Sequence, residues 1–210
     1  MFRNLTQYVC AKALVVAVRL AFVLACFLVP LLSAAAPAPR LVVAIRDYAD
    51  VPRDTLDLAE AQVSKVFGRA GVTIEWRDLP GSGSSTVEFA ELKPAFVVAL
   101  LPNSMAARLR CSLGAFGFAV GTRAYVFTDR TRLAAAHRGN DFARALGVVM
   151  AHEIGHVLLG PNGHLPGSIM SPRLGKMEFG QGERGALLFH PTQAEQIREQ
   201  VRTQEVAQAR

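Results

Sequence analysis

The 210-residue sequence predicts one α+β domain, residues 37–210, that follows an N-terminal export signal. After residue 40, segments of alternating apolar residues occur between segments whose apolar residues recur at helical spacing. The order of a strand, a helix, a run of strands, a helix, a loop and a final helix favours a twisted mixed sheet of about four to five strands, packed on two helices plus a C-terminal helix. The composition, 51% hydrophobic and 19% charged, excludes disordered, collagenous and coiled-coil chains.

The first 36 residues have the layout of a secretory signal peptide. The basic residues of this leader are Arg3, Lys12 and Arg19. Leu20–Leu32 is an apolar core, and the small residues Ser33–Ala36 form a cleavage site with the cut expected near Ala36. An uncleaved membrane anchor is the alternative, although Arg19 and Pro30 interrupt the apolar run. We therefore expect export to the periplasm or the medium, with no stable membrane association after cleavage.

Charge and cysteine content narrow the expected partners. Three of the 23 basic residues and none of the 17 acidic residues lie in the leader, so the remaining chain has a net charge of +3. Its basic residues are scattered and do not alternate with aromatic ones, which argues against nucleic acid as a partner. Cys10 and Cys26 lie in the leader, so Cys111 cannot form an internal disulfide and the core must stabilise the domain. We expect a monomer.

The first half of the domain reads as strand, helix and strand. Leu41–Tyr48 is apolar with β-branched residues at its start, which predicts a strand. Asp50-Val51-Pro52 predicts a helix start and Gly71 a helix stop. Val72–Asp78 alternates apolar and polar residues, as in a half-buried strand. The apolar residues at helical spacing between them are Leu56, Leu58, Ala59, Val63, Val66 and Phe67.

Three more strands are predicted before the second helix. Leu79–Ser85, rich in serine and glycine, predicts a surface loop, and Phe96–Leu101 predicts a strand. Phe116–Val120 and Arg123–Thr128 flank Gly121-Thr122, a pair suited to a two-residue hairpin.

Helix signals dominate the C-terminal half. Asp141 can cap a helix from about Phe142 to Leu159, and Gly160 can end it. A loop rich in glycine and proline is predicted up to about His190. Thr192-Gln193-Ala194-Glu195 has the form of a capping box, which predicts a final helix up to about Thr203.

The second long helix carries the pattern HExxH, formed by His152, Glu153 and His156. Residues four apart lie one turn apart on one helix face, so both imidazoles can bind one ion. Glu153 lies on the adjoining flank, within reach of a metal-bound water. A catalytic zinc has three protein ligands and one open position, so the pattern predicts a zinc hydrolase with Glu153 as general base. The alternative, two surface histidines, conflicts with the apolar neighbours of the motif, since a buried unpaired His-Glu-His group is costly.

A third ligand must come from elsewhere in the chain. His164 follows His156 by eight residues, beyond a turn in which Gly160 lets the chain leave the helix sharply. His164 is therefore the expected third ligand. The alternatives are His190, Glu178 and Glu183, of which His190 fits a helix start better, and His137 is expected to be solvated.

The stretch from His152 to Met170, HEIGHVLLGPNGHLPGSIM, resembles the metzincin clan of zinc metallopeptidases, whose pattern is HExxHxxGxxH followed by a methionine turn. The resemblance implies a zincin-like fold in which His152, His156 and His164 bind one Zn²⁺ ion and Glu153 is the general base. It also implies that Met170 is the turn methionine beneath the metal. The chain departs from the pattern because its loop holds two extra residues, and it lacks a tyrosine after Met170, for which Arg173 is a possible substitute.

The resemblance further implies a place for substrate. In such enzymes substrate lies along an edge strand that pairs with the strand before the active-site helix. The corresponding edge strand would be Phe116, Gly117, Phe118, Ala119 and Val120, paired with Arg123–Thr128. A latency role for Cys111, with its thiolate on the zinc, is a further possibility, and a small core residue is the simpler interpretation.

These observations together predict a secreted zinc-dependent metalloendopeptidase that acts on polypeptides. Two alternatives stay open. One is a non-catalytic zinc-binding domain on a metallopeptidase scaffold, and the other is a zinc amidohydrolase that acts on cell-wall or other non-protein amides.

Overall fold

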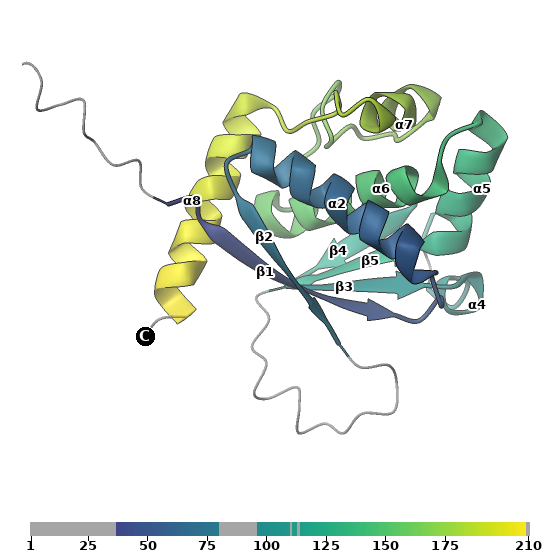
Figure 1. The fold of residues 1–210 in the computed structure, drawn as a ribbon, viewed down its shortest axis with the longest axis horizontal. Helices are drawn as coiled ribbons and strands as arrows, with labels where there is room; N and C mark the ends of the chain where they lie inside the picture. The colour runs from purple at the N-terminus through teal and green to yellow at the C-terminus, as the bar shows by residue number, and fades with distance from the viewer. Residues whose placement is uncertain (1–36, 80–95, 110, 113, 209–210) are drawn as a thin grey trace, which may run out of the picture. The chain divides into compact units, whose positions relative to one another are not determined.

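The computed structural model describes residues 37–79, 96–109, 111–112 and 114–208 (Figure 1). Ala38–Arg210 forms one compact unit by its backbone contacts. The predicted leader and nearly all of the predicted loop Leu79–Ser85 lie outside the described residues.

A five-stranded mixed sheet of the predicted kind forms the centre of the domain, in the order β2-β1-β3-β5-β4. The first four strands in this order run parallel, and β4 pairs antiparallel with β5 at one edge (Figure 1). The strands are β1 (Arg40–Asp47), β2 (Thr73–Asp78), β3 (Phe96–Leu101), β4 (Gly117–Val120) and β5 (Arg123–Phe127). The predicted hairpin is confirmed, because Gly121, with φ at +57°, and Thr122 alone connect β4 to β5.

Two helices, α2 (Arg53–Arg69) and α6 (Phe142–Leu159), pack against each other and cover one face of the sheet (Figure 1). Their close approach depends on Gly147 of α6, because a Cβ atom there would lie 2.7 Å from the carbonyl oxygen of Ala59. The predicted apolar stripe of α2 is buried except for Leu58, which is 54% exposed. Including Leu58 was wrong, since it points away from the face that the stripe buries.

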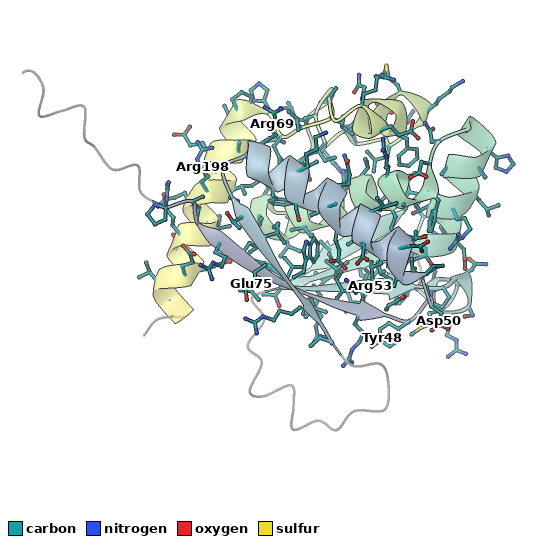
Figure 2. All side chains as sticks on the ribbon, viewed as in Figure 1. Tyr48, Asp50, Arg53, Arg69, Glu75 and Arg198 are labelled. Atoms are coloured by element: carbon teal, nitrogen blue, oxygen red, sulfur yellow. The ribbon has the colours of Figure 1, made fainter. Side chains whose placement is uncertain are left out.

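Helix α8 (Pro191–Gln208) contacts α6 and β1 and begins earlier than predicted. The backbone N–H of His190 donates to Oε1 of Gln193 at 3.0 Å, so the cap lies two residues before the predicted box Thr192–Glu195. Arg198 of α8 also contacts the C-terminal end of α2. Its Nη1 atom donates to the carbonyl of Ala70, the C-cap residue of α2, at 2.9 Å, and Figure 2 shows Arg198 beside the end of α2 that carries Arg69.

Three helices were not predicted: α4 (Asn103–Ala106), α5 (Thr128–Arg138) and α7 (Lys176–Glu183). Helix α5 follows β5 without a linker, so Thr128, predicted to end the strand, is helical; its hydroxyl donates to the carbonyl of Leu101 at 2.9 Å. Helix α7 lies in the predicted loop, and its two glycines hid it because glycine disfavours helix. Gly182 is required there, since a Cβ atom would collide with the side chain of Val148 on α6.

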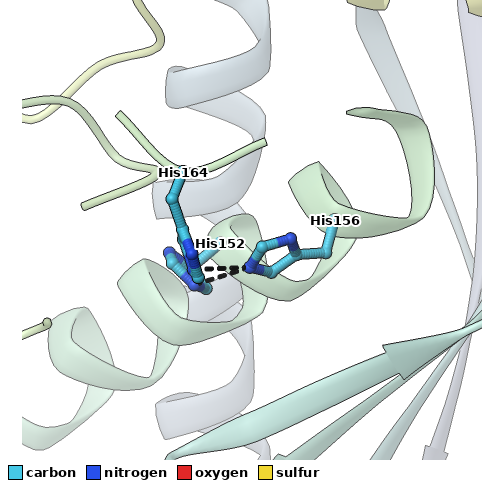
Figure 3. A group of neighbouring side chains, drawn as sticks. All are labelled: His152, His156 and His164. Carbon is cyan, nitrogen blue, oxygen red and sulfur yellow. Dashed lines mark hydrogen bonds between the residues drawn. The ribbon is translucent and has the colours of Figure 1, made fainter. Parts of the chain in front are cut away.

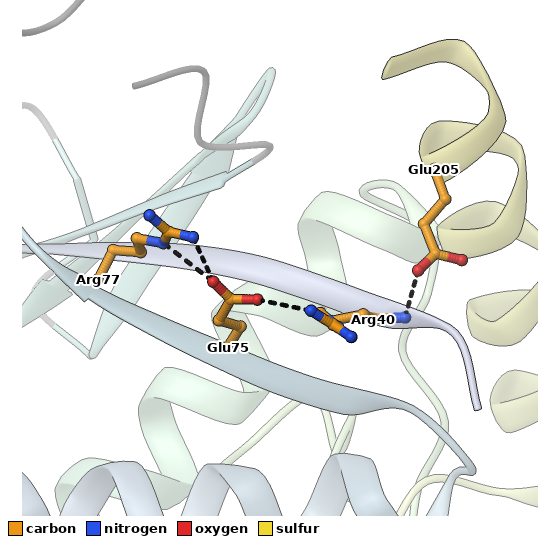
Figure 4. Close-up of polar contacts among 4 residues, drawn as sticks. All are labelled: Arg40, Glu75, Arg77 and Glu205. Carbon is orange, nitrogen blue, oxygen red and sulfur yellow. Dashed lines mark hydrogen bonds and ion pairs between the residues drawn. The ribbon is translucent and has the colours of Figure 1, made fainter. Parts of the chain in front are cut away.

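The start of β1 is held by polar contacts. The backbone N–H of Arg40 donates to Oε1 of Glu205 on α8 at 2.7 Å, and its guanidinium contacts Glu75 of β2 at 3.3 Å (Figure 4). Arg77 of the same strand also pairs with Glu75, and these two arginines lower the pKa of the Glu75 carboxyl. These contacts tie the start of the sheet to the C-terminal helix.

Among the described residues, α6 is the one helix that is long and apolar enough to cross a membrane. This is weak evidence for a span, because 72% of that segment is buried inside the domain. Its apolar character is explained by its position between α2, α7, α8 and the strands β4 and β5.

Candidate metal centre

Helix α6 begins as predicted at Phe142, where the side chain of its N-cap Asp141 accepts a hydrogen bond from the N–H of Arg144 at 2.9 Å. The helix brings His152 and His156 one turn apart. His152 is only 7% exposed, so its imidazole is held by the surrounding core. The two histidines of the motif therefore lie on a well-packed helix.

The loop after α6 brings His164 to the same point (Figure 3). Nε2 of His156 lies 3.1 Å from Nε2 of His152 and 3.0 Å from Nε2 of His164. Gly160, with φ at +80°, ends the helix and turns the chain, and the N–H of Gly163 donates back to its carbonyl at 3.2 Å. The three histidines thus lie close enough to bind a metal ion, although the loop is two residues longer than the metzincin pattern.

Backbone carbonyls fix the tautomers of the two helical histidines. Nδ1 of His152 lies 2.8 Å from the carbonyl oxygen of Ile169, and Nδ1 of His156 lies 3.1 Å from that of Gly160. A carbonyl can only accept, so both Nδ1 atoms carry the proton and both Nε2 atoms present a lone pair to the shared point. Lone pairs this close repel each other unless a cation lies between them, and three nitrogens on one tetrahedral zinc stand about 3.3–3.4 Å apart. The donor set fits a metal of this kind.

Burial keeps the imidazole of His152 neutral. It lowers the pKa of His152 to about 4, against the opposing effect of the hydrogen bond to Ile169, and the neighbouring imidazoles lower it further. Burial and the proximity of His156 also lower the pKa of His164. Because only neutral imidazole binds a metal, these shifts leave the site competent at neutral pH.

Glu153 lies beside the three histidines without joining their group. It is 4% exposed, and its Oε2 atom is buried without a hydrogen-bond partner. Burial raises the pKa of its carboxyl to about 8. A buried carboxyl with an unpaired oxygen is costly in a purely structural role, and such perturbed groups cluster at functional sites.

Strand β4 runs directly past this carboxylate. A Cβ atom at Gly117 would lie 2.7 Å from Oε1 of Glu153 and would also collide with the carbonyl oxygen of Tyr125. Gly117 therefore leaves the space that the carboxylate occupies.

Met170 lies under the helical pair. It is fully buried, and a Cβ atom added to Gly155, between the two helical histidines, would collide with its Sδ atom. The turn around Met170 is closed by a hydrogen bond from the N–H of Leu165 to its carbonyl at 2.8 Å. This turn also supplies the Ile169 carbonyl that orients His152. Met170 thus packs against the helix turn between the two histidines, and its role as a turn methionine beneath a metal stays a prediction.

A cleft of about 1020 Å³ opens over the histidines and Glu153. Its lining includes the whole predicted edge strand, Phe116–Val120, and a second segment, Ser171–Leu174. The two-residue hairpin makes Val120 and Arg123 a hydrogen-bonded pair, and such pairs alternate along an antiparallel ladder. The N–H and C=O groups of Gly117 and Ala119 therefore point away from β5, to the free edge of the sheet.

The other candidate ligands have different partners. Glu178 accepts from the N–H of Gly175 at 2.9 Å and Glu183 from that of Asp141 at 2.6 Å, so both cap helices. The ring of His190 contacts the hydroxyl of Thr192 at 2.8 Å, and His137 lies exposed on α5. Both glutamates lie in α7, a helix that was not predicted.

Cys111 is partly buried among apolar residues on the other side of the sheet and does not line the cleft. Its packing agrees with the simpler interpretation of a small core residue, and nothing in this arrangement brings its thiol to the histidines.

Sequence reasoning missed a residue that holds the loop of His164. Gln193, at the start of α8, is buried, and its Nε2 atom donates to the carbonyl of Gly163 at 2.8 Å while its Oε1 atom caps the helix. The one local signal is that Gln193 follows His190 by three residues, the spacing of a capping box. This signal is weak, because histidine is not a usual N-cap residue. Only the fold shows that α8 supports the loop.

The group contains no fourth histidine, cysteine or carboxylate ligand among the residues that the structure describes. An ion held by these three imidazoles would have only three protein ligands, which is the number found in catalytic rather than structural zinc sites. Comparisons of the chain with protein-family models and with curated proteins find no match.

Proposed function

We propose that the chain is a secreted zinc-dependent metalloendopeptidase with a metzincin-like fold. One arrangement carries the proposal: three convergent Nε2 atoms beside a buried carboxylate with an unpaired oxygen, at the floor of a cleft bordered by a free sheet edge. Export rests on the predicted signal peptide, residues 1–36. Zinc is the preferred metal because three imidazoles with one open position are its usual catalytic ligand set.

Zinc in such a site lowers the pKa of a bound water and polarises the substrate carbonyl. His152, His156 and His164 would hold the ion, and the carbonyls of Ile169 and Gly160 keep two of the imidazoles in the binding tautomer. A water bound to this ion would lie beside the Glu153 carboxyl.

Glu153 is the proton carrier. Its unpaired Oε2 atom can accept a proton from the attacking water and deliver it to the leaving amine nitrogen. Burial raises the pKa of the Glu153 carboxyl to about 8 in the metal-free protein, so this environment favours uptake of the proton from the water. A cation nearby would stabilise the carboxylate, which keeps Glu153 ionised at the start of the cycle and favours release of the proton to the amine.

The substrate backbone pairs with β4. An extended peptide can add to the free edge through the N–H and C=O groups of Gly117 and Ala119, which places its carbonyl over the floor of the cleft. The edge strand carries no charged residue, so it accepts peptides of varied sequence.

The test compares the wild type with Glu153→Gln, which keeps the shape of the side chain and removes the base. We expect the variant to keep its zinc by elemental analysis and to lose about 10²–10⁴-fold in hydrolysis of a peptide library. Glu199→Gln on the exposed face of α8 is the matched control and should behave as wild type.

Four outcomes would count against the proposal. Full activity in Glu153→Gln would exclude Glu153 as the base. Unchanged zinc content in His152→Ala would exclude the ligand set. A zinc-loaded wild type that cleaves no peptide would favour the non-catalytic domain, and cleavage restricted to cell-wall amides would favour the amidohydrolase.

A further inference from the structure

The segment Ser171–Leu174 lines the cleft together with β4 and the histidines. It is short and held in place: Ser171 is buried, and its hydroxyl donates to the carbonyl of Arg173 at 3.2 Å. Pro172 restricts the backbone between them. Arg173 is exposed and lines the cleft, so a held backbone carries a solvent-accessible arginine there.

Arg173 differs from most arginines of the described chain, because its guanidinium has no hydrogen-bond or ion-pair partner there. Arg40 and Arg77 pair with Glu75. Arg130 and Arg198 donate to backbone carbonyls. The absence of a partner leaves all the donors of Arg173 available to a ligand.

The cleft has few charged residues. Among the described lining residues, only Glu153 and Arg173 have side chains that are charged outside the histidine group, and Glu153 is buried at the floor. The rest of the lining is apolar or neutral, including Val157, Pro161 and Leu174. An arginine on walls of low polarity attracts anions more strongly than one on an open surface.

We propose, on the basis of the proposed function, that Arg173 selects substrates that carry a carboxylate close to the scissile bond. A guanidinium binds a carboxylate through two parallel hydrogen bonds, which gives it a preference over neutral amides. A strand on β4 advances about 3.3 Å per residue, so Arg173 can reach only a few substrate positions. The carboxylate belongs to an aspartate or glutamate side chain, or to the end of the substrate chain.

The experiment scans one carboxylate along a neutral peptide. Peptides acetylated and amidated at their ends carry a single Asp, or Asn as its neutral match, at each of three positions on either side of the cleaved bond. A further pair differs only in a free or amidated C-terminus. We expect kcat/KM of the zinc-loaded wild type to favour Asp over Asn about 10-fold or more at one position, as for a charge-assisted pair.

Two substitutions of Arg173 and one control assign the effect. In Arg173→Gln the Asp/Asn ratio should fall to about one, and in Arg173→Glu a peptide with Lys at that position should become the better substrate. Arg69→Gln, an exposed arginine at the end of α2 outside the cleft, should keep the wild-type ratio. Preference for a free C-terminus that is lost in Arg173→Gln would also support the inference and would identify the chain end as the source.

Binding to zinc-loaded Glu153→Gln, measured by calorimetry with and without Arg173→Gln, separates this inference from the proposed function. Equal affinity for the Asp and Asn peptides, or a preference that survives Arg173→Gln, overturns the inference even if peptides are cleaved. An Asp preference in binding that needs Arg173 supports it even if the wild type cleaves none of them, in which case the proposed function alone fails.

Discussion

The two edge strands of the sheet differ in charge, and so do the two glutamates beside them. At the β2 edge, Glu75 is half-buried and pairs with Arg77 and Arg40, which lower the pKa of its carboxyl. At the β4 edge, Glu153 is buried, and burial raises the pKa of its carboxyl to about 8. One residue type is thus held ionised at one edge and favours its protonated form at the other, because solvent and partners set the proton affinity of a carboxyl.

The edges also differ in how well they resist pairing with another strand. Charged side chains on β2 discourage pairing, whereas β4 carries only glycine, alanine and apolar residues, with Val120 63% exposed. An unprotected edge favours unwanted pairing with other strands unless it has a use. Its position at the cleft supports the proposal that a substrate strand occupies it.

Among changes at the two sheet edges, the largest effect is expected from removing the space beside β4. In Gly117→Ala the new methyl group would occupy the position of the Glu153 carboxylate, and either strand or carboxylate must shift. We expect peptidase activity to fall about 100-fold, as for a misplaced catalytic group. Stability should fall by about 1–3 kcal/mol from overpacking.

Glu75→Ala on β2 is the control for Gly117→Ala and should leave kcat/KM unchanged. Activity assays and denaturant unfolding of both variants test the comparison. Wild-type activity in Gly117→Ala would show that the carboxylate does not depend on β4.

The second prediction concerns the pH dependence of metal-free protein. Glu153 binds its proton more tightly when folded, so its contribution to stability is present below pH ~4.5 and is lost as the pH rises through ~8. His152 has a lowered pKa, so its contribution is present above pH ~6.5 and is lost as the pH falls through ~4. Between pH ~4.5 and ~6.5 the two contributions to stability change in opposite directions as the pH rises. Above pH ~6.5 only the contribution of Glu153 still changes, and it decreases.

We therefore expect the free energy of unfolding to fall by about 2 kcal/mol between pH 6.5 and 8, from roughly 1.4 kcal/mol per pH unit. In Glu153→Gln this fall should be absent, while Glu75→Gln should keep it. Urea unfolding after chelation, at several pH values, measures it. A stability curve that rises over this interval in the wild type would contradict the assignment.

A third, smaller effect is expected on zinc affinity, from a change to Gln193, which supports the loop of His164. In Gln193→Glu the helix cap on His190 can persist, but the donor to the Gly163 carbonyl is lost, so the loop of His164 is less well held. We expect zinc affinity to fall about 10-fold, as for other residues that support a ligand. Competition with a chelator measures the affinity, and an unchanged melting temperature of the metal-free protein would show that the effect is not general destabilisation.

The smallest effect is expected at the β2 edge itself. Glu75→Gln removes the anion between two exposed arginines, and surface ion pairs contribute little. The melting temperature should change by less than in any variant above, and the change should vanish at high salt. A large loss of stability that does not depend on salt would show that the Arg40–Glu75 pair contributes more to stability than a surface ion pair does.

Much of the fold could be predicted because local pattern and tertiary role agree. The alternation of Val72–Asp78 and the Gly121-Thr122 turn predict the strand and hairpin that form. Helix α7 could not be predicted, because its glycines are explained only by the packing of Gly182 on Val148. The capping box at Thr192 was misplaced because its actual N3 residue, Gln193, also serves a distant loop.

By itself, the sequence determined that two imidazoles and a carboxylate share one turn of helix, since a period of 3.6 residues places positions four apart on one face. It also determined the two-residue hairpin that leaves β4 at an edge. Only the tertiary structure decided that His164 completes the group, that Ile169 and Gly160 orient the imidazoles, and that Gly117 makes room for Glu153. The reason is that spacing along a helix is fixed by backbone geometry, whereas the path of a loop depends on residues far away in the chain, here Gln193 on α8.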